Sequence, residues 1–216
     1  MDISYLGHSS FKIRGKDATV ITDPFDPVKV GIKYPREEAD IVTVSHDHFD
    51  HNFLGKIISP KMVINVPGEY EVMGVSIMGI STYHDDENGK LRGKNIIYVI
   101  ETDNLRIAHL GDLGHKLGEK LIDQIGDLDV LLIPVGGVYT VTPKVAAEIV
   151  KDLEPSITIP MHYKADDMNQ ESFGKLAKVD EFLQELGYDV EKLDKLSIKK
   201  ELINEEELKV VVLERK

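Results

Sequence analysis

Histidine and aspartate residues crowd one short segment of the chain, which reads Ser45-His46-Asp47-His48-Phe49-Asp50-His51. Imidazole nitrogens and carboxylate oxygens are ligands that proteins use for Zn²⁺, Mn²⁺ and Fe²⁺. His46 and His48 are two residues apart and can face one metal, whereas Asp50 and His51 are adjacent and can turn toward a second metal. The alternative is a solvated polar loop, which such dense spacing disfavours. The segment therefore predicts a site for two metal ions.

The chain contains no cysteine, which limits the kinds of site that it can form. Disulfides, iron–sulfur clusters, thiolate zinc sites and cysteine nucleophiles are excluded, so any metal must be held by histidine and carboxylate ligands. These ligand types discriminate poorly among zinc, manganese and iron. We expect two divalent ions, with Zn²⁺ as the first choice and Mn²⁺ or Fe²⁺ as alternatives.

Charge and hydropathy bear on the partners and the location of the protein. The 38 acidic and 26 basic residues give a net charge of -12, which repels the phosphate backbone of nucleic acids. Residues 1–15 lack an apolar signal core, and no segment approaches the roughly 20 apolar residues that a membrane span needs. We therefore expect a small-molecule substrate, no nucleic-acid or membrane partner, and by default a cytoplasmic location. The oligomeric state is left open.

The metal-binding segment must be positioned by the elements around it, and the apolar residues 41–44 directly before it read as a strand. The first half of the chain has almost no helical pattern, whereas strands and helices alternate after Asn104. Strands are expected over residues 3–6, 11–13, 19–22, 41–44, 62–65, 75–80, 95–101, 106–110, 130–133, 157–159 and 208–213, and helices over 118–125, 143–153 and 171–186. No linker separates the halves, so we expect one domain over residues 1–216 with a layered α/β sandwich fold.

The spacing of His46, His48, Asp50 and His51 resembles the signature of the metallo-β-lactamase superfamily, and further motifs of that family follow in its order over nearly the whole chain. These motifs are matched by Asp23 after an early strand, the isolated His84, the pair Gly111-Asp112, and His162 after a late strand. Within the superfamily, the small metal-dependent hydrolase branch, related to the ascorbate-phosphate lactonases, is most similar in the segments Leu6-Gly7-His8-Ser9, Asp23-Pro24-Phe25, Pro134-Val135-Gly136-Gly137 and Pro160-Met161-His162-Tyr163.

The resemblance implies an αββα sandwich in which two similar β/α halves hold the metals between them. It implies that one metal is bound by His46, His48 and His84, that the other is bound by Asp50, His51 and His162, and that Asp112 bridges the two. Asp23 would lie behind the ligands and accept a proton from a ligand imidazole, which fixes the tautomer of that imidazole.

The ligand positions outside the central segment also have structural alternatives. Asp112 and His162 each lie just beyond an apolar run that reads as a strand, which is where α/β proteins often place ligands. His84 precedes a polar turn over residues 85–89 and could be a loop histidine. Asp23 could be only a turn former before Pro24.

Three further histidines have no assigned role. Alternation along the strand over residues 106–110 turns His109 away from Asp112, so we expect a satisfied core histidine. His8 lies in a turn between two strands and His115 lies just ahead of a helix, and either could approach a substrate.

One loop and one lysine are candidates for contact with the substrate. The pair Gly136-Gly137 can let backbone come close to a substrate, with a hydroxyl from Tyr139 or Thr140 beside it. Lys164 can meet an anionic group of the substrate. An ordinary turn and an ordinary exposed lysine are the alternatives.

A two-metal site predicts hydrolysis. Two divalent cations that share a water lower its pKa toward neutrality, which yields a bridging hydroxide without a separate strong base. We expect this hydroxide to attack a small-molecule ester, lactone or phosphoester, with Asp50 and Asp112 as catalytic carboxylates. Two other functions are open: a phosphodiesterase or nuclease acting on short nucleic acid or a cyclic nucleotide, and a metal-stabilised binding module without catalysis.

Overall fold

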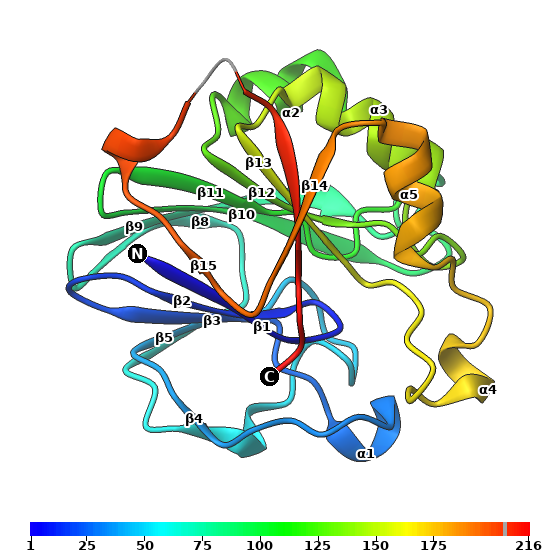
Figure 1. Ribbon diagram of the computed structural model, residues 1–216. Coiled ribbons are helices and arrows are strands. Elements are labelled where there is room, and N and C mark those ends of the chain that lie inside the picture. The colour runs from blue at the N-terminus through cyan, green and yellow to red at the C-terminus, as the bar shows by residue number, and fades with distance from the viewer. Residues whose placement is uncertain (205–206) are drawn as a thin grey trace.

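A computed structural model describes residues 1–204 and 207–216 (Figure 1). These residues form two mixed β-sheets that face each other, with most of the helical segments on the outer side of the second sheet. None of the helices among them is long and apolar enough to cross a membrane.

The described residues form a first sheet of six strands and a second sheet of eight. The order in the first sheet is β15 (Leu196–Ser197), β1 (Asp2–Gly7), β2 (Ser10–Arg14), β3 (Thr19–Thr22), β5 (Ile41–Thr43) and β7 (Met62–Ile64). The order in the second sheet is β14 (Asp189–Leu193), β16 (Lys209–Leu213), β13 (Ile157–Met161), β12 (Val130–Pro134), β11 (Leu105–His109), β10 (Lys94–Thr102), β9 (Val75–Tyr83) and β8 (Gly68–Val72). A separate short pair consists of β4 (Glu37–Glu38) and β6 (Ile57–Ile58).

The helices are short. They are α1 (Pro27–Val30), α2 (Glu119–Ile125), α3 (Pro143–Leu153), α4 (Gln170–Phe173) and α5 (Val179–Leu186), together with 3₁₀ turns at Leu54–Lys56 and Lys200–Leu202. The longest, α3, begins as the sequence predicts, because the side chain of Thr142 caps the backbone N–H of Val145 and Pro143 occupies the first helical position.

Parallel strands in both sheets direct the proposed ligands toward one region. In the first sheet β3, β5 and β7 are parallel, and in the second sheet β11, β12 and β13 are parallel. Asp23 follows β3 and residues 45–51 follow β5, while Asp112 follows β11 and His162 follows β13. The carboxyl ends of parallel strands are the usual place for ligands in α/β proteins.

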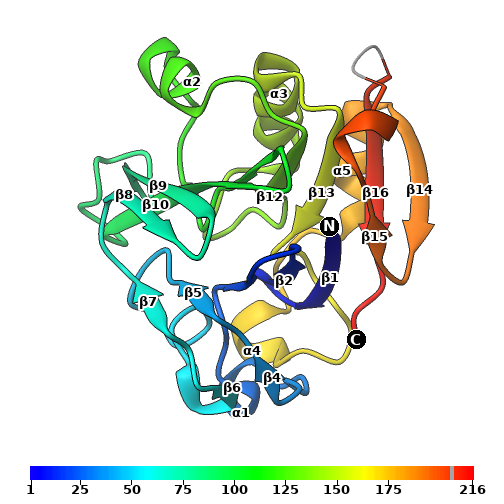
Figure 2. The same cartoon turned by 90° about the vertical axis from the view of Figure 1, so that its left-hand side faces the viewer.

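Three buried clusters of apolar side chains separate four layers, which are also visible in Figure 2. Leu132 of β12 points between the sheets, whereas its neighbour Leu131 points outward to meet α3 and α5, as strand alternation requires. A third cluster, which includes Val42 and Phe173, covers the outer face of the first sheet. This is the αββα sandwich expected from the sequence, with the layer outside the first sheet reduced to α1, α4 and loops.

The single helix predicted over residues 171–186 is wrong. The structure instead has α4 and α5, separated by residues 174–178. The backbone of Ala177 is used for tertiary contacts, because its N–H donates to Gly136 O at 2.8 Å and its carbonyl accepts from Lys164 N at 2.9 Å. Those bonds replace the ones that a continuous helix would make.

The charged segment over residues 191–207 contributes to edge strands of both sheets. β14 pairs with β16 in the second sheet, and β15 pairs with β1 in the first. Residues 205–206 of this segment lie outside the described residues. Strand β8 was not predicted and forms the opposite edge of the second sheet.

Candidate metal centre

Four histidine side chains surround the carboxylate of Asp112. The distances from Asp112 Oδ2 to the Nε2 atoms are 3.2 Å for His51, 3.2 Å for His162, 3.3 Å for His84 and 3.9 Å for His46. The side chains come from loops that follow strands of both sheets. The structure thus brings together residues that are up to 116 positions apart in the sequence, from His46 to His162.

The ligand atoms fall into three compact groups, each with all its atoms within 4.8 Å of one another. The groups are His46, His48 and His84; His8, Asp50, His51 and His162; and His46, His51 and Asp112. The first two contain the two ligand sets that the sequence resemblance implies, and the third places Asp112 beside a histidine of each. His8 is an addition to the second set.

The buried polar atoms of this cluster fit metal ions. His46 Nε2, His51 Nε2, His162 Nε2 and Asp112 Oδ1 are buried without a hydrogen-bond partner among the described residues. The Nε2 atoms of His51 and His162 lie close to Asp112 Oδ2, but their geometry is not that of a hydrogen bond. Several buried polar atoms without a partner in one place are energetically costly, and a bound ion or water would satisfy them. Divalent cations would satisfy all of them together.

Asp23 orders two of the proposed ligands from behind. Its Oδ2 accepts from His51 Nδ1 at 2.8 Å and from the Ser45 hydroxyl at 2.6 Å. The same Ser45 oxygen lies 2.9 Å from His46 Nδ1 and accepts its proton. Each imidazole therefore carries its proton on Nδ1 and presents Nε2 to the centre, which is the arrangement of a metal-binding histidine with an outer carboxylate.

His109 ties the two halves together next to Asp112. Its Nε2 donates to Ser9 O at 2.8 Å, and its Nδ1 accepts from Gly111 N at 3.2 Å. One ring nitrogen donates and the other accepts, so the ring is neutral. Burial lowers the pKa of His109, in agreement with that state. The prediction of a satisfied core histidine agrees with these contacts.

Gly111 and Asn95 shape the turn that carries Asp112. Gly111 has φ 56°, and a Cβ at this position would lie 2.3 Å from Asn95 Oδ1 and 2.7 Å from Ser45 Cβ. Asn95 Oδ1 accepts from Asp112 N at 2.9 Å, and its amide group donates to Thr82 Oγ1. Only glycine fits this turn, because both the left-handed backbone and the close contact exclude a side chain. Sequence reasoning missed Asn95, whose role depends on contacts with distant segments.

Asp85 organises the loop that follows His84. Its carboxylate accepts hydrogen bonds from the backbone N–H groups of Glu87, Gly89, Leu91 and Arg92 at 2.7–3.0 Å. The loop closes on His84, whose N–H donates to Gly93 O at 3.0 Å. The polar sequence at 85–89 is therefore an ordered loop that fixes the backbone of a proposed ligand.

Three site residues adopt the left-handed backbone conformation that favours glycine. His8 has φ 54°, Asp23 has φ 38° and His162 has φ 51°. Such residues cost on the order of 1–3 kcal/mol each and persist where the surrounding structure holds them. All three lie in or directly behind the cluster of ligand atoms.

His51 and Asp112 shift each other's pKa toward their charged forms. Burial by itself lowers the pKa of His51, but the carboxylates of Asp112 and Asp50 raise it well above its ordinary value. Burial raises the pKa of Asp112, but His162 and His51 lower it well below its ordinary value. Burial and the nearby charge of His51 also hold the pKa of His46 well below its ordinary value. A cation held here would take the place of the proton on His51 Nε2.

Two of the residues predicted to contact the substrate, Tyr139 and Lys164, donate hydrogen bonds to backbone carbonyls of the chain itself. Tyr139 OH donates to Ser172 O at 2.8 Å, and Lys164 Nζ donates to Gly174 O at 2.7 Å. Gly137 has φ 64° in a bend that includes Val138. The substrate roles of Gly137, Tyr139 and Lys164 therefore stay predictions. The guanidinium of Arg92 lies 5.7 Å from the centre of the Tyr139 ring.

One histidine of the cluster is exposed to solvent, and another histidine nearby in the fold lies outside the cluster. His48 is exposed, which opens the cluster to solvent on its side. His115 lies outside the three groups, where its Nδ1 donates to Lys116 O at 2.8 Å and its Nε2 accepts from Tyr83 N at 3.4 Å.

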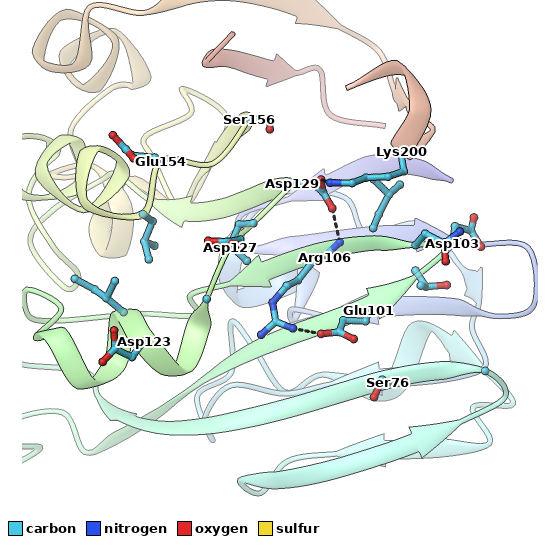
Figure 3. A pocket seen from close by; sticks show the side chains of 18 of the residues that line it. Ser76, Glu101, Asp103, Arg106, Asp123, Asp127, Asp129, Glu154, Ser156 and Lys200 are labelled. Carbon is cyan, nitrogen blue, oxygen red and sulfur yellow. Dashed lines mark hydrogen bonds and ion pairs between the residues drawn. The ribbon is translucent and has the colours of Figure 1, made fainter. Parts of the chain in front are cut away.

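A large cavity lies away from this centre, at the amino ends of β12 and β13 (Figure 3). Its volume is about 1310 Å³, and its lining includes Arg106, Asp129 and Ser156. Asp129 accepts from Arg106 N at 2.8 Å and from Lys200 Nζ at 2.8 Å, and Arg106 also pairs with Glu101. The proposed ligands lie at the carboxyl ends of the strands, so this cavity is not the metal centre.

Known proteins resemble this chain over most of its length. The family model described as the beta-lactamase superfamily domain matches residues 2–162. A UPF0173 metal-dependent hydrolase of Methanopyrus kandleri is 29% identical in an alignment of 224 positions that covers 88% of this chain and 95% of the relative. A UPF0173 metal-dependent hydrolase of Thermococcus onnurineus is 33% identical in an alignment of 189 positions that covers 74% of this chain and 84% of the relative.

A solved structure shows the same architecture. This Thermotoga maritima protein, assigned to the Zn-dependent hydrolases of the metallo-β-lactamase superfamily, is 38% identical to this chain. The two structures superpose with a TM-score of 0.81, covering 100% of this chain and 99% of the other.

Proposed function

The chain belongs to the beta-lactamase superfamily, among its metal-dependent hydrolases, and on this premise we propose that it hydrolyses a small-molecule ester, lactone or phosphoester at a centre of two divalent cations. The observation that carries the proposal is the convergence of four imidazole Nε2 atoms within 3.9 Å of Asp112 Oδ2, together with orphaned nitrogen and oxygen atoms in the same place.

The proposed ligand sets follow the compact groups of atoms. His46, His48 and His84 would hold one cation, and Asp50, His51 and His162 would hold the other. Asp112 would contact both, because its carboxylate lies next to histidines of each set. Zn²⁺ is the first choice for an all-nitrogen-and-oxygen site of this kind, and Mn²⁺ or Fe²⁺ would also suit it.

The chemistry of the proposed reaction divides between cations and protein. When bound, two divalent cations supply an acidified water as the nucleophile and positive charge for the oxygen that becomes negative in the transition state. The protein's part is to hold the ligands rigidly. Asp23 and Ser45 fix His46 and His51, while Asn95 fixes the turn of Asp112. The exposed His48 leaves a route for the substrate.

A small-molecule substrate is supported by the charge of the chain. The net charge of -12 repels a polyanion, whereas the repulsion of a small neutral or singly charged molecule is weak. The class of scissile bond depends on the loops around the centre, since one fold hosts many activities.

The proposal is tested by reconstituting the chelator-stripped protein separately with Zn²⁺, Mn²⁺ and Fe²⁺ and assaying ester, lactone and phosphodiester panels. We expect metal-dependent turnover of at least one substrate class. In His46→Ala and Asp112→Ala the turnover should fall on the order of 100-fold or more, as it does when a catalytic group is removed. His115→Gln, a histidine outside the cluster, is the matched control and should retain activity.

Two results would overturn the proposal. One is full metal content and full activity in both His46→Ala and Asp112→Ala. The other is tight binding of small molecules with no turnover in any panel, which would favour a metal-stabilised binding module.

A further inference from the structure

His8 is buried beside the proposed ligands of the second cation, although it lies far from them in the sequence. It occupies the turn between β1 and β2 and is 1% exposed. Its backbone has φ 54°, so the chain adopts a strained conformation to place this side chain. Its ring nitrogen belongs to the same compact group as atoms of Asp50, His51 and His162.

The side chain of His8 contacts the carboxylate of Asp50. The distance from His8 Nε2 to Asp50 Oδ2 is 3.1 Å. A carboxylate accepts hydrogen bonds, so Nε2 carries the proton and donates it. A nitrogen that donates to a carboxylate has no lone pair to offer to a metal. The contact therefore makes Nε2 of His8 a partner of the proposed ligand Asp50 and not a metal ligand.

The backbone of His8 also holds a second proposed ligand. Its carbonyl accepts from His162 N at 2.9 Å and from the Tyr5 hydroxyl at 2.9 Å. The rings of His8 and His162 lie with their centres 4.2 Å apart. One residue thus contacts Asp50 through its side chain and His162 through its backbone.

Aromatic side chains screen the His8–Asp50 contact from water. The His8 ring centre lies 5.0 Å from that of Phe173 and 6.3 Å from that of Phe25, and both pack edge-on against it. A hydrogen bond in such apolar surroundings is stronger than one that competes with solvent. Asp50 is itself 8% exposed.

We propose that His8 is a positioning residue for the second cation, holding one oxygen of Asp50 by a hydrogen bond so that the carboxylate is oriented for metal binding. The inference rests on the proposed function, since it concerns the same pair of cations. Outer hydrogen bonds to ligand carboxylates are worth on the order of 10–100-fold in metal affinity or activity. His8 would therefore matter for one cation and not for the other.

Two substitutions separate the hydrogen bond from other effects. His8→Asn removes it, because the asparagine side chain is too short to reach Asp50, while asparagine tolerates the left-handed backbone that this position requires. His8→Gln retains an amide N–H at nearly the reach of histidine Nε2 and should restore the bond. His115→Gln serves as the control for removing a histidine elsewhere.

The experiment measures stepwise Co²⁺ binding to each chelator-stripped protein by competition with an indicator, together with visible absorption spectra at saturating Co²⁺. We expect His8→Asn to weaken one of the two binding steps on the order of 10–100-fold and to leave the other unchanged. His8→Gln should lie within a few fold of wild type. The saturated spectra should have wild-type intensity, because the number of ligands does not change.

Three outcomes would overturn the inference. In the first, His8→Asn binds both cations as wild type does. In the second, His8→Gln is as weak as His8→Asn and its saturated spectrum changes in intensity, which would make His8 a ligand. In the third, His8→Asn weakens both steps equally, as a general structural defect would. Thermal melting of the metal-free variants checks that each is folded.

Failure of this inference is distinguishable from failure of the proposed function. If wild type binds two Co²⁺ ions and His8→Asn does too with equal affinity, only the role of His8 fails. If wild type binds none, the two-cation centre itself fails.

Discussion

Asp23 is the residue on which the order of the ligand histidines depends. One carboxylate oxygen accepts from His51 and from Ser45, and Ser45 in turn accepts from His46. The other oxygen accepts from Ser45 N at 2.8 Å. Burial raises the pKa of Asp23, but the neighbouring histidines outweigh it and hold the pKa below its ordinary value. The group is therefore a carboxylate at neutral pH and an acceptor for every one of these bonds.

Replacing Asp23 by asparagine should weaken metal binding. The amide Nδ2 of Asp23→Asn cannot accept a proton from His51 or Ser45, so His51 loses the bond that orients Nε2 toward the centre. We expect metal affinity to fall on the order of 10–100-fold, measured by chelator competition. Asp26→Asn is the matched control, since the side chain of Asp26 caps α1 and asparagine caps a helix as well as aspartate. Wild-type affinity in Asp23→Asn would contradict this role.

Sequence patterns identify the proposed ligands more readily than the residues that support them. The central segment has a spacing that few other structures need, and Asp112 and His162 each follow an apolar strand. His8 could not be assigned from sequence, because its partner Asp50 is 42 positions away and meets it only in the folded chain. Asn95 is an ordinary strand residue in the sequence, and only its contact with the Asp112 turn gives it a role.

At the scale of elements, the loop after His84 depends on a single carboxylate. Although burial raises the pKa of Asp85, four backbone N–H groups lower it to about 2. In the unfolded chain the pKa returns to about 3.9. The folded pKa is depressed, so the stability that Asp85 contributes is present above about pH 4 and is lost as the pH falls from about 4 to about 2.

Asp85→Asn should remove this pH-dependent contribution. The variant should be less stable than wild type near neutral pH, and the difference in unfolding free energy should shrink as the pH falls through the same range, because wild-type Asp85 becomes protonated. Urea unfolding of both metal-free proteins at a series of pH values measures the difference. A difference that does not change with pH would show that the charge of Asp85 does not hold the loop.

Tyr98 joins the two sheets across the central core. It lies on β10 of the second sheet, and its buried hydroxyl is 2.9 Å from both Val44 O and Ile64 O. Val44 directly follows β5 and Ile64 ends β7, both in the first sheet. Val44 is the residue before Ser45, so this contact fixes the start of the metal-binding segment.

Tyr98→Phe should destabilise the fold by about 1–3 kcal/mol, because the hydrogen bond that the buried hydroxyl donates to these carbonyls is lost while the ring still fills the core. Chemical denaturation measures the loss. Tyr83→Phe is the control: Tyr83 is 37% exposed and should change stability by less than about 0.5 kcal/mol. Equal stability of Tyr98→Phe and wild type would mean that packing alone joins the sheets here.

Elements with strong local patterns could be predicted, and those defined by tertiary contacts could not. The cap and proline at Thr142-Pro143 mark the start of α3 in the sequence. The helix predicted over residues 171–186 fails because Ala177 bonds to Gly136 and Lys164 instead of continuing a helix. β8 escaped prediction because its sequence Gly-Glu-Tyr-Glu-Val is largely polar and lies at an exposed edge.

At the scale of the whole molecule, the αββα fold follows from the pattern of elements and from the family resemblance together. Short strands in the first half and alternating strands and helices in the second predict layers, but they do not determine which strands pair. The order of strands within each sheet could not be predicted either. β15 forms one edge of the first sheet and β14 one edge of the second, and both come from a charged segment whose apolar pattern is weak. A single domain over residues 1–216 stays a prediction.

The proposed centre lies where the carboxyl ends of parallel strands from both sheets meet. The two halves must therefore pack correctly for the ligands to come together. Asp50 and His51 come from the first sheet's loops, whereas Asp112 and His162 come from the second sheet's. Metal binding should therefore stabilise the fold as a whole, since cations that bind only the folded chain shift the unfolding equilibrium.

The most direct test of the two-cation centre is the metal content per chain by mass spectrometry, on wild type and His162→Asn reconstituted separately with zinc, manganese and iron. Asparagine suits the left-handed backbone at position 162, so the variant should fold. We expect two ions per wild-type chain with at least one of these metals, falling toward one in the variant. No bound metal under any condition, or equal content in both proteins, would contradict it.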